Sequence, residues 1–115
     1  MPGLSTSLSA LNAFSVGVQG TAYNIANVST DGFRPVSVRY RSGRPADFGV
    51  EPVITRPRPM PDELVGRTPG PLPFSRTDVA REMTHLMVNQ RSFEANAAVV
   101  RSVDEMLGVL VDLRV

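Results

Sequence analysis

Residues 79–107 read VAREMTHLMVNQRSFEANAAVVRSVDEML, and this stretch decides the fold. It contains no proline or glycine and is rich in strong helix formers, so it predicts one long helix. Apolar side chains recur in it every seven residues, at Val79, Leu86, Phe93, Val100 and Leu107. A seven-residue apolar period keeps one face of a helix against another helix as the two supercoil. The stretch therefore predicts a helix that needs a partner helix.

The N-terminal segment offers that partner. The same period recurs there, at Leu4, Leu11, Val18 and Ile25. We expect a helix from Leu4 to about Val28. Gly17 and Gly20 each cost such a helix about 1 kcal/mol relative to alanine. The helix is therefore weak in isolation and depends on a partner surface.

The segment between the helices holds nine of the ten prolines. Residues 33–41 alternate apolar and polar side chains, with Val36, Val38 and Tyr40 on one side, and this pattern predicts a strand with one wet face. Residues 50–55 can return as a second strand, which Pro52 confines to an edge. Residues 56–74, RPRPMPDELVGRTPGPLPF, predict an extended spacer. A proline-rich ligand for a peptide-binding module is the alternative.

The sequence thus predicts a mainly α fold in which the N- and C-terminal helices pair as an antiparallel-like coiled coil. A small β-hairpin and proline-rich segment forms the middle. We expect residues 1–30 to form the N-terminal helix of the core, residues 31–74 the middle, and residues 75–115 the C-terminal helix.

The apolar stripes also predict where the molecule makes its contacts. An intrachain seam should place Leu11, Val18 and Ile25 against Leu86, Phe93 and Val100. A second stripe on the C-terminal helix, at Val99, Val103, Met106, Leu110 and Leu113, suggests a further neighbour. The predicted coiled-coil and assembly interface comprises Leu4, Leu8, Leu11, Val18, Ile25, Val79, Met83, Leu86, Phe93, Val100, Leu107 and Leu110.

Composition argues against several function classes. A net charge of +1 gives no general attraction to nucleic acid or anionic membrane. The chain has no cysteine and a single histidine, His85, one helical turn from Glu82, which a solvated helix face explains as well as a site does. We expect no catalysis, metal or cofactor. No stretch approaches the roughly 20 apolar residues of a membrane span, and the N-terminus does not predict a cleavable signal peptide.

Polar side chains lie inside both helices. Asn24 and Asn27 are three residues apart at the end of the first helix, and Gln90 and Asn96 flank Phe93 on the second. Buried amides at a helix seam fix its register at some cost in stability. A polar helix end and a solvated face explain the same residues equally well.

These residues also carry a family resemblance. At the N-terminal end it rests on Ser7-Leu8-Ser9-Ala10-Leu11-Asn12-Ala13 and on Asn24-Ile25-Ala26-Asn27-x-x-Thr30-x-Gly32-Phe33. At the C-terminal end it rests on Asp78-Val79-Ala80-Arg81-Glu82-Met83, Asn89-Gln90-Arg91-Ser92-Phe93-Glu94-Ala95-Asn96 and Asp104-Glu105-Met106-Leu107. Together they resemble the terminal signatures of flagellar rod, hook and hook-associated axial proteins. The signature residues are Asn24, Asn27, Thr30, Gly32, Phe33, Glu82, Met83, Gln90 and Asn96.

The resemblance implies a structural subunit of the bacterial flagellar basal-body rod. Its terminal helices would line the core of a helical tube, and its partners would be copies of itself and other axial subunits. Export would use the flagellar export apparatus, without a cleavable signal peptide, and the rod would span the periplasm. The short middle segment resembles the proximal rod subunits best, although residues 56–74 depart from the middle pattern expected of a standard proximal subunit.

A different class of function also fits the stripes. A free coiled-coil adaptor or regulatory protein would bind one partner helix and form a discrete dimer in solution. A rod subunit would instead order its termini as it polymerises. The two hypotheses differ in the size and helicity of the species in solution.

Overall fold

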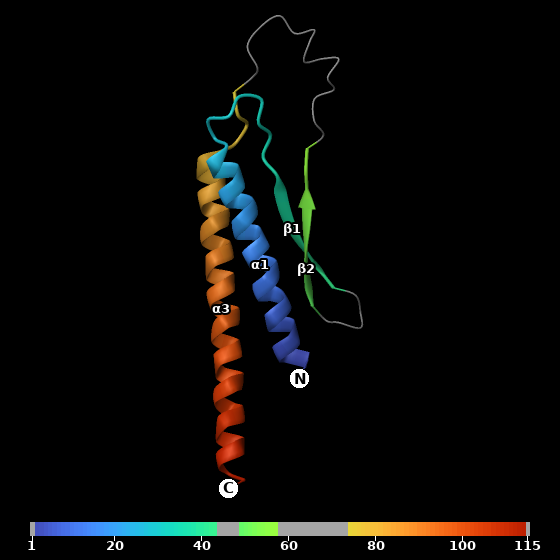
Figure 1. Ribbon diagram of the computed structural model, residues 1–115, viewed down its shortest axis with the longest axis vertical. Helices are drawn as coiled ribbons and strands as arrows, with labels where there is room; N and C mark the ends of the chain where they lie inside the picture. Colours follow the sequence, from blue (N-terminus) through green and yellow to red (C-terminus); the bar gives the residue numbers. More distant parts are fainter. Residues whose placement is uncertain (1, 44–48, 58–73, 115) are drawn as a thin grey trace, which may run out of the picture.

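The computed structural model describes residues 2–43, 49–57 and 74–114. Its elements in chain order are α1 (Pro2–Ala26), β1 (Ser37–Ser42), β2 (Val50–Thr55) and α3 (Val79–Asp112). The two helices lie side by side and run in opposite directions, and the two-stranded hairpin lies beside α1 (Figure 1). The expected fold class is confirmed: the chain is mainly helical, its terminal helices pair, and the hairpin is small.

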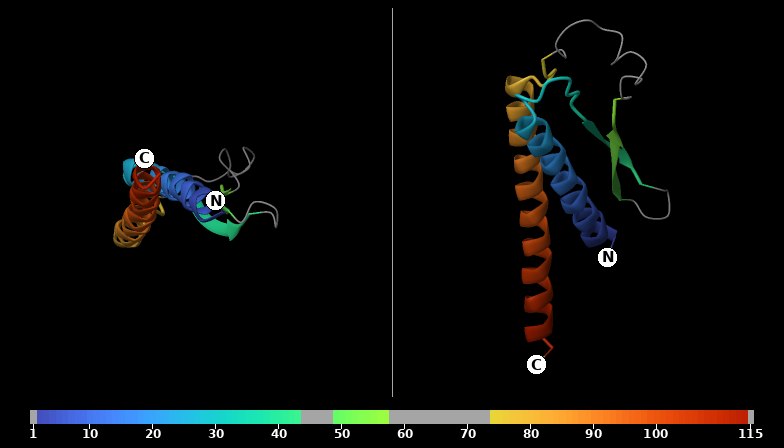
Figure 2. Two further views of the ribbon diagram at one scale, coloured as in Figure 1. Left: turned by 90° about the horizontal axis from the view of Figure 1, so that it is seen from below. Right: turned by 45° about the horizontal axis from the view of Figure 1, so that its top comes forward.

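Helix α3 is longer than α1 and continues beyond it. The views in Figures 1 and 2 place the end of α3 past the N-terminal end of α1. Asp78 caps the start of α3, because its side chain accepts a hydrogen bond from the backbone N–H of Arg81 at 3.3 Å. Gly108 lies within the helix without ending it. The last turns of α3 therefore have no neighbouring element in the described part of the chain.

A polar turn redirects the chain from α1 to β1. The Asn27 amide donates to the Tyr23 carbonyl at 2.9 Å, and the Thr30 hydroxyl donates to Asn27 Oδ1 at 3.1 Å. Gly32 has a φ of 74°, a conformation that favours glycine. The backbone N–H of Arg76 donates to the Phe33 carbonyl at 3.1 Å. This bond joins the end of the turn to the entry of α3.

The strands pair as predicted, with Ser37 opposite Thr55 and Ser42 opposite Val50. Val38 and Tyr40 are half-buried, whereas Arg39 and Arg41 are exposed. In a two-stranded sheet both strands are edges, so Pro52 is tolerated in β2. Strand β1 therefore turns Val38 and Tyr40 toward α1, whereas Ile54 of β2 is exposed.

Most of the proline-rich stretch, residues 58–73, lies outside the described residues, as do residues 44–48. The spacer and ligand interpretations of this stretch stay predictions. In the part of the chain that the structure describes, neither helix combines the length and the hydropathy needed to span a membrane.

Candidate functional site

The buried contact between the elements is made by small and polar side chains. On α1 the buried residues are Ser7, Ala10, Ala13, Gly17, Thr21 and Asn24, and on α3 they are Glu82 and Asn89. Small residues let neighbouring elements approach closely, and buried polar groups require hydrogen-bond partners. Two such hydrogen-bonded contacts join α1, the β1 segment and α3.

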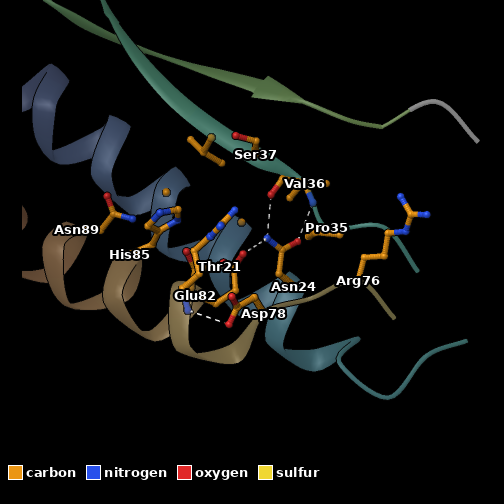
Figure 3. A pocket seen from close by; sticks show the side chains of 14 residues that line it. Thr21, Asn24, Pro35, Val36, Ser37, Arg76, Asp78, Glu82, His85 and Asn89 are labelled. Atoms are coloured by element: carbon orange, nitrogen blue, oxygen red, sulfur yellow. Dashed lines mark hydrogen bonds between the residues drawn. The ribbon is translucent and has the colours of Figure 1, made fainter. Parts of the chain in front are cut away.

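The first contact centres on Asn24, which is 2% exposed. Its Oδ1 accepts from the Val36 backbone N–H at 2.8 Å, and its Nδ2 donates to the Val36 carbonyl at 2.8 Å. The same Nδ2 donates to Glu82 Oε1 at 3.1 Å. One amide thereby pairs with the backbone leading into β1 and with a buried carboxylate on α3, as Figure 3 shows. We name these bonds the Asn24 contact.

The second contact lies one heptad away. The Tyr40 hydroxyl donates to Asn89 Oδ1 at 2.6 Å, and the Tyr40 ring meets Phe14 edge-on with centroids 4.9 Å apart. Burial raises the pKa of Tyr40 above its ordinary value. The hydroxyl passes over Gly17, where an added Cβ would collide with it and lie 2.9 Å from Asn89 Nδ2. We name this arrangement the Tyr40 contact.

A cavity of about 180 Å³ opens between the two contacts, with Thr21, Asn24, Glu82, His85 and Asn89 among its lining residues (Figure 3). The lining holds an amide–carboxylate pair. Among the described residues no three His, Asp or Glu side chains gather where they could hold a metal ion. The chemistry of the cavity is hydrogen bonding between elements.

None of the residues predicted for the interface is fully buried in the single chain. Half-buried are Leu4, Leu11, Val18, Ile25, Leu86 and Val100; exposed are Leu8, Val79, Met83, Phe93, Leu107 and Leu110. The buried positions of α1 are occupied by smaller residues, such as Ala10 and Ala13, because two other elements must fit against α1 at close range. The role of the large apolar residues in assembly stays a prediction.

Several signature residues form hydrogen bonds, but of the two contacts defined above they contribute only to the Asn24 contact. Asn24 and Glu82 bond to each other, and Asn27 and Thr30 bond in the turn that Gly32 and Phe33 complete. The Asn96 amide donates to the Ser92 carbonyl at 2.8 Å, and Gln90 bonds the exposed Glu94 at 3.2 Å. Sequence reasoning missed Asn89 as a partner of Tyr40 and the burial of Glu82. Asn89 lies seven residues from Glu82, and this spacing indicates that both side chains lie on the same face of the helix.

Beyond α1, the face of α3 changes from polar to apolar. The heptad position of Glu82 and Asn89 continues through Asn96 to Val103 and Leu110. Val103 is half-buried and Leu110 is 59% exposed. Their neighbours Val99, Met106 and Leu113 are also exposed. This stretch is a large apolar surface that nothing covers within the described part of the chain.

A comparison with known protein families found a match that includes helix α3. Residues 72–113 match the family model described as flagellar basal body rod FlgEFG protein C-terminal. The matched range contains the whole of α3. No curated protein matched the chain. The match confirms the resemblance at the C-terminal end, whereas the motifs in residues 7–33 lie outside the matched range.

Proposed function

We propose that this chain, whose residues 72–113 match the C-terminal family model of flagellar basal-body rod proteins, is a rod subunit that polymerises through its terminal helices. The family consists of structural components of the flagellum, and this domain points to a structural role in the basal body. The observation that best supports this proposal is that the matched region contains a 34-residue helix whose end is uncovered and apolar.

The physical case for polymerisation comes from that uncovered end. Monomeric soluble proteins rarely expose contiguous apolar patches of more than a few hundred Å². Each large apolar side chain that becomes fully buried contributes about 1.5–3 kcal/mol. Covering the end of α3 with a neighbouring chain would therefore stabilise an assembly over the single molecule.

The finer assignment follows from size and family. The middle segment is short, which fits a proximal rod subunit. Its partners are other axial subunits and copies of itself, delivered by the flagellar export apparatus to the rod in the periplasm. No nucleic acid, membrane insertion or cofactor enters this function.

A concentration series tests the proposal. Sedimentation should show species that grow in mass with concentration, and circular dichroism should show helicity rising with them. Leu110→Asp should abolish the growth in mass while leaving the helicity of the dilute chain nearly unchanged. Glu105→Gln, which also changes the charge by one unit on the same part of α3, should assemble normally.

The rival is a free coiled-coil adaptor, favoured by the pairing of two amphipathic helices. It requires a dimer of fixed mass with high helicity at every concentration. That result would overturn the rod assignment.

A further inference from the structure

Helix α1 carries no charge. None of the chain's Asp, Glu, Arg or His residues lies between Pro2 and Ala26. Several residues of α1 are nevertheless exposed to solvent in the single chain. They include Leu8, Asn12, Gln19 and Ala22. Solvent-facing helix surfaces normally carry charged residues. An exposed but uncharged face indicates a surface that a neighbour covers.

The uncharged face has the spacing of a coiled-coil seam. Leu8, Asn12, Ser15, Gln19 and Ala22 follow one another at intervals of four, three, four and three residues. We name these five residues the outer stripe of α1. Its members are mostly short, which lets another helix approach closely.

The uncovered end of α3 shows the same spacing. Val99, Val103, Met106, Leu110 and Leu113, which we name the end stripe of α3, repeat the intervals of four, three, four and three. The opposite side of this part of α3 carries Arg101, Glu105 and Asp112. One side therefore suits water and the other suits a protein partner.

The two stripes match in length and in chemistry. Each spans 15 residues, so its first and last residues lie about 21 Å apart along the helix. The end stripe offers only apolar side chains and the outer stripe offers uncharged side chains that are mostly shorter, a combination that lets knobs of one helix enter holes of the other. Neither stripe brings a charge that the other would have to desolvate.

We propose that the end stripe of α3 in one copy docks on the outer stripe of α1 in a second copy. The inference rests on the proposed function, because it names the surfaces through which the chain polymerises. Pairing two end stripes with each other would close the assembly at a dimer and leave α1 uncovered. Pairing unlike stripes leaves one of each free on every dimer, so growth continues.

The absence of cysteine in the chain permits a direct test by disulfide cross-linking. Ser15 and Met106 are the midpoints of the two stripes, so they meet whichever way the helices run. A Ser15→Cys chain is mixed with a Met106→Cys chain of different tag, at concentrations where sedimentation shows assembly, and oxidised mildly. We expect the mixed disulfide to exceed, severalfold, the one formed with Glu105→Cys, the neighbouring residue on the charged side.

The outcomes separate this inference from the proposed function. Two results would overturn the docking of unlike stripes and leave polymerisation standing. In one, the Met106→Cys chains form disulfides with each other. In the other, Met106→Cys and Glu105→Cys give equal yields of the mixed disulfide with Ser15→Cys. A chain that sediments as a monomer or a fixed dimer at all concentrations overturns both. Asn12→Lys adds a measurement without cysteine: it should stop the growth in mass while the helicity of the dilute chain is retained, and undiminished growth contradicts the docking.

Discussion

Gly17 lies where side chains from β1 and α3 both approach the backbone of α1. The Tyr40 hydroxyl and the Asn89 amide occupy the space that a side chain at this position would fill. A glycine inside a helix normally costs about 1 kcal/mol relative to alanine. At this position the close approach of two polar side chains offsets that cost.

Gly17→Ala should therefore destabilise the chain, against the trend of helix propensity. Overpacking of a close contact costs about 1–3 kcal/mol, which exceeds the gain in propensity. Denaturant unfolding measures the difference. The matched control is Gly108→Ala, since an added Cβ there meets nothing within 4 Å. We expect the control to gain stability, and a gain at both positions would contradict the close approach at Gly17.

Tyr40 makes stability depend on pH at the alkaline end. Burial raises its pKa above the ordinary 10.0, so the folded chain keeps the phenol proton to higher pH than the unfolded chain does. This contribution is complete below the unfolded pKa and is lost as pH rises through the folded pKa. The free energy of unfolding should fall above about pH 10. Tyr40→Phe should lessen the fall, while Tyr23→Phe should not; equal falls in both variants would exclude this role of Tyr40.

At the scale of elements, local sequence patterns predicted most of what formed. The Asp78 cap, the proline-free run after it and the alternation in residues 33–41 are local signals. The structure shows α3 and β2 where the sequence indicated them, whereas β1 begins at Ser37, four residues later than the alternation. The buried contact was harder to predict. Whether Asn24 is a polar helix end or a buried amide depends on Val36 and Glu82, which adjoin it only after folding.

The apolar stripe of α3 makes a prediction about assembly. Phe93 is 39% exposed in the single chain. Phe93→Ala should therefore cost less unfolding free energy than the 3–5 kcal/mol typical of a buried phenylalanine. Its larger effect should appear in polymerisation, measured by sedimentation. Met87→Ala, outside the stripe, is the control. Cells carrying Phe93→Ala that build full-length rods and swim normally would show that the stripe is not an assembly seam.

The molecule as a whole is elongated. It extends 77 × 28 × 17 Å with a radius of gyration of 20.1 Å, whereas a compact domain of this length has about 13 Å. Helix α3 is the longest element, with 34 residues and a length of about 51 Å, and its far end has no neighbour among the described residues. Among the described residues, most apolar side chains are exposed or half-buried, and the buried apolar core consists of Ala10 and Ala13.

Small-angle scattering of the dilute chain tests this shape. We expect a radius of gyration near 20 Å, with scattering at wide angles that reports two paired helices. A value near 13 Å would mean that α3 folds back on the rest of the chain. Deleting residues 104–115 should shorten the particle and abolish assembly while leaving the Asn24 and Tyr40 contacts intact, since none of their residues is removed.

The Asn24 and Tyr40 contacts have a consequence for errors in folding. A stripe that repeats every seven residues presents the same apolar positions after one helix shifts by seven residues along the other. Apolar packing alone therefore permits the two helices to pair in a wrong register. After such a slip Asn24 would face Asn89, and the Glu82 carboxylate would lose the amide that donates to it. Tyr40, fixed to α1 through its strand, would no longer reach Asn89. The Asn24–Glu82 and Tyr40–Asn89 hydrogen bonds thus select one alignment of the two helices, which the seven-residue apolar repeat alone does not specify.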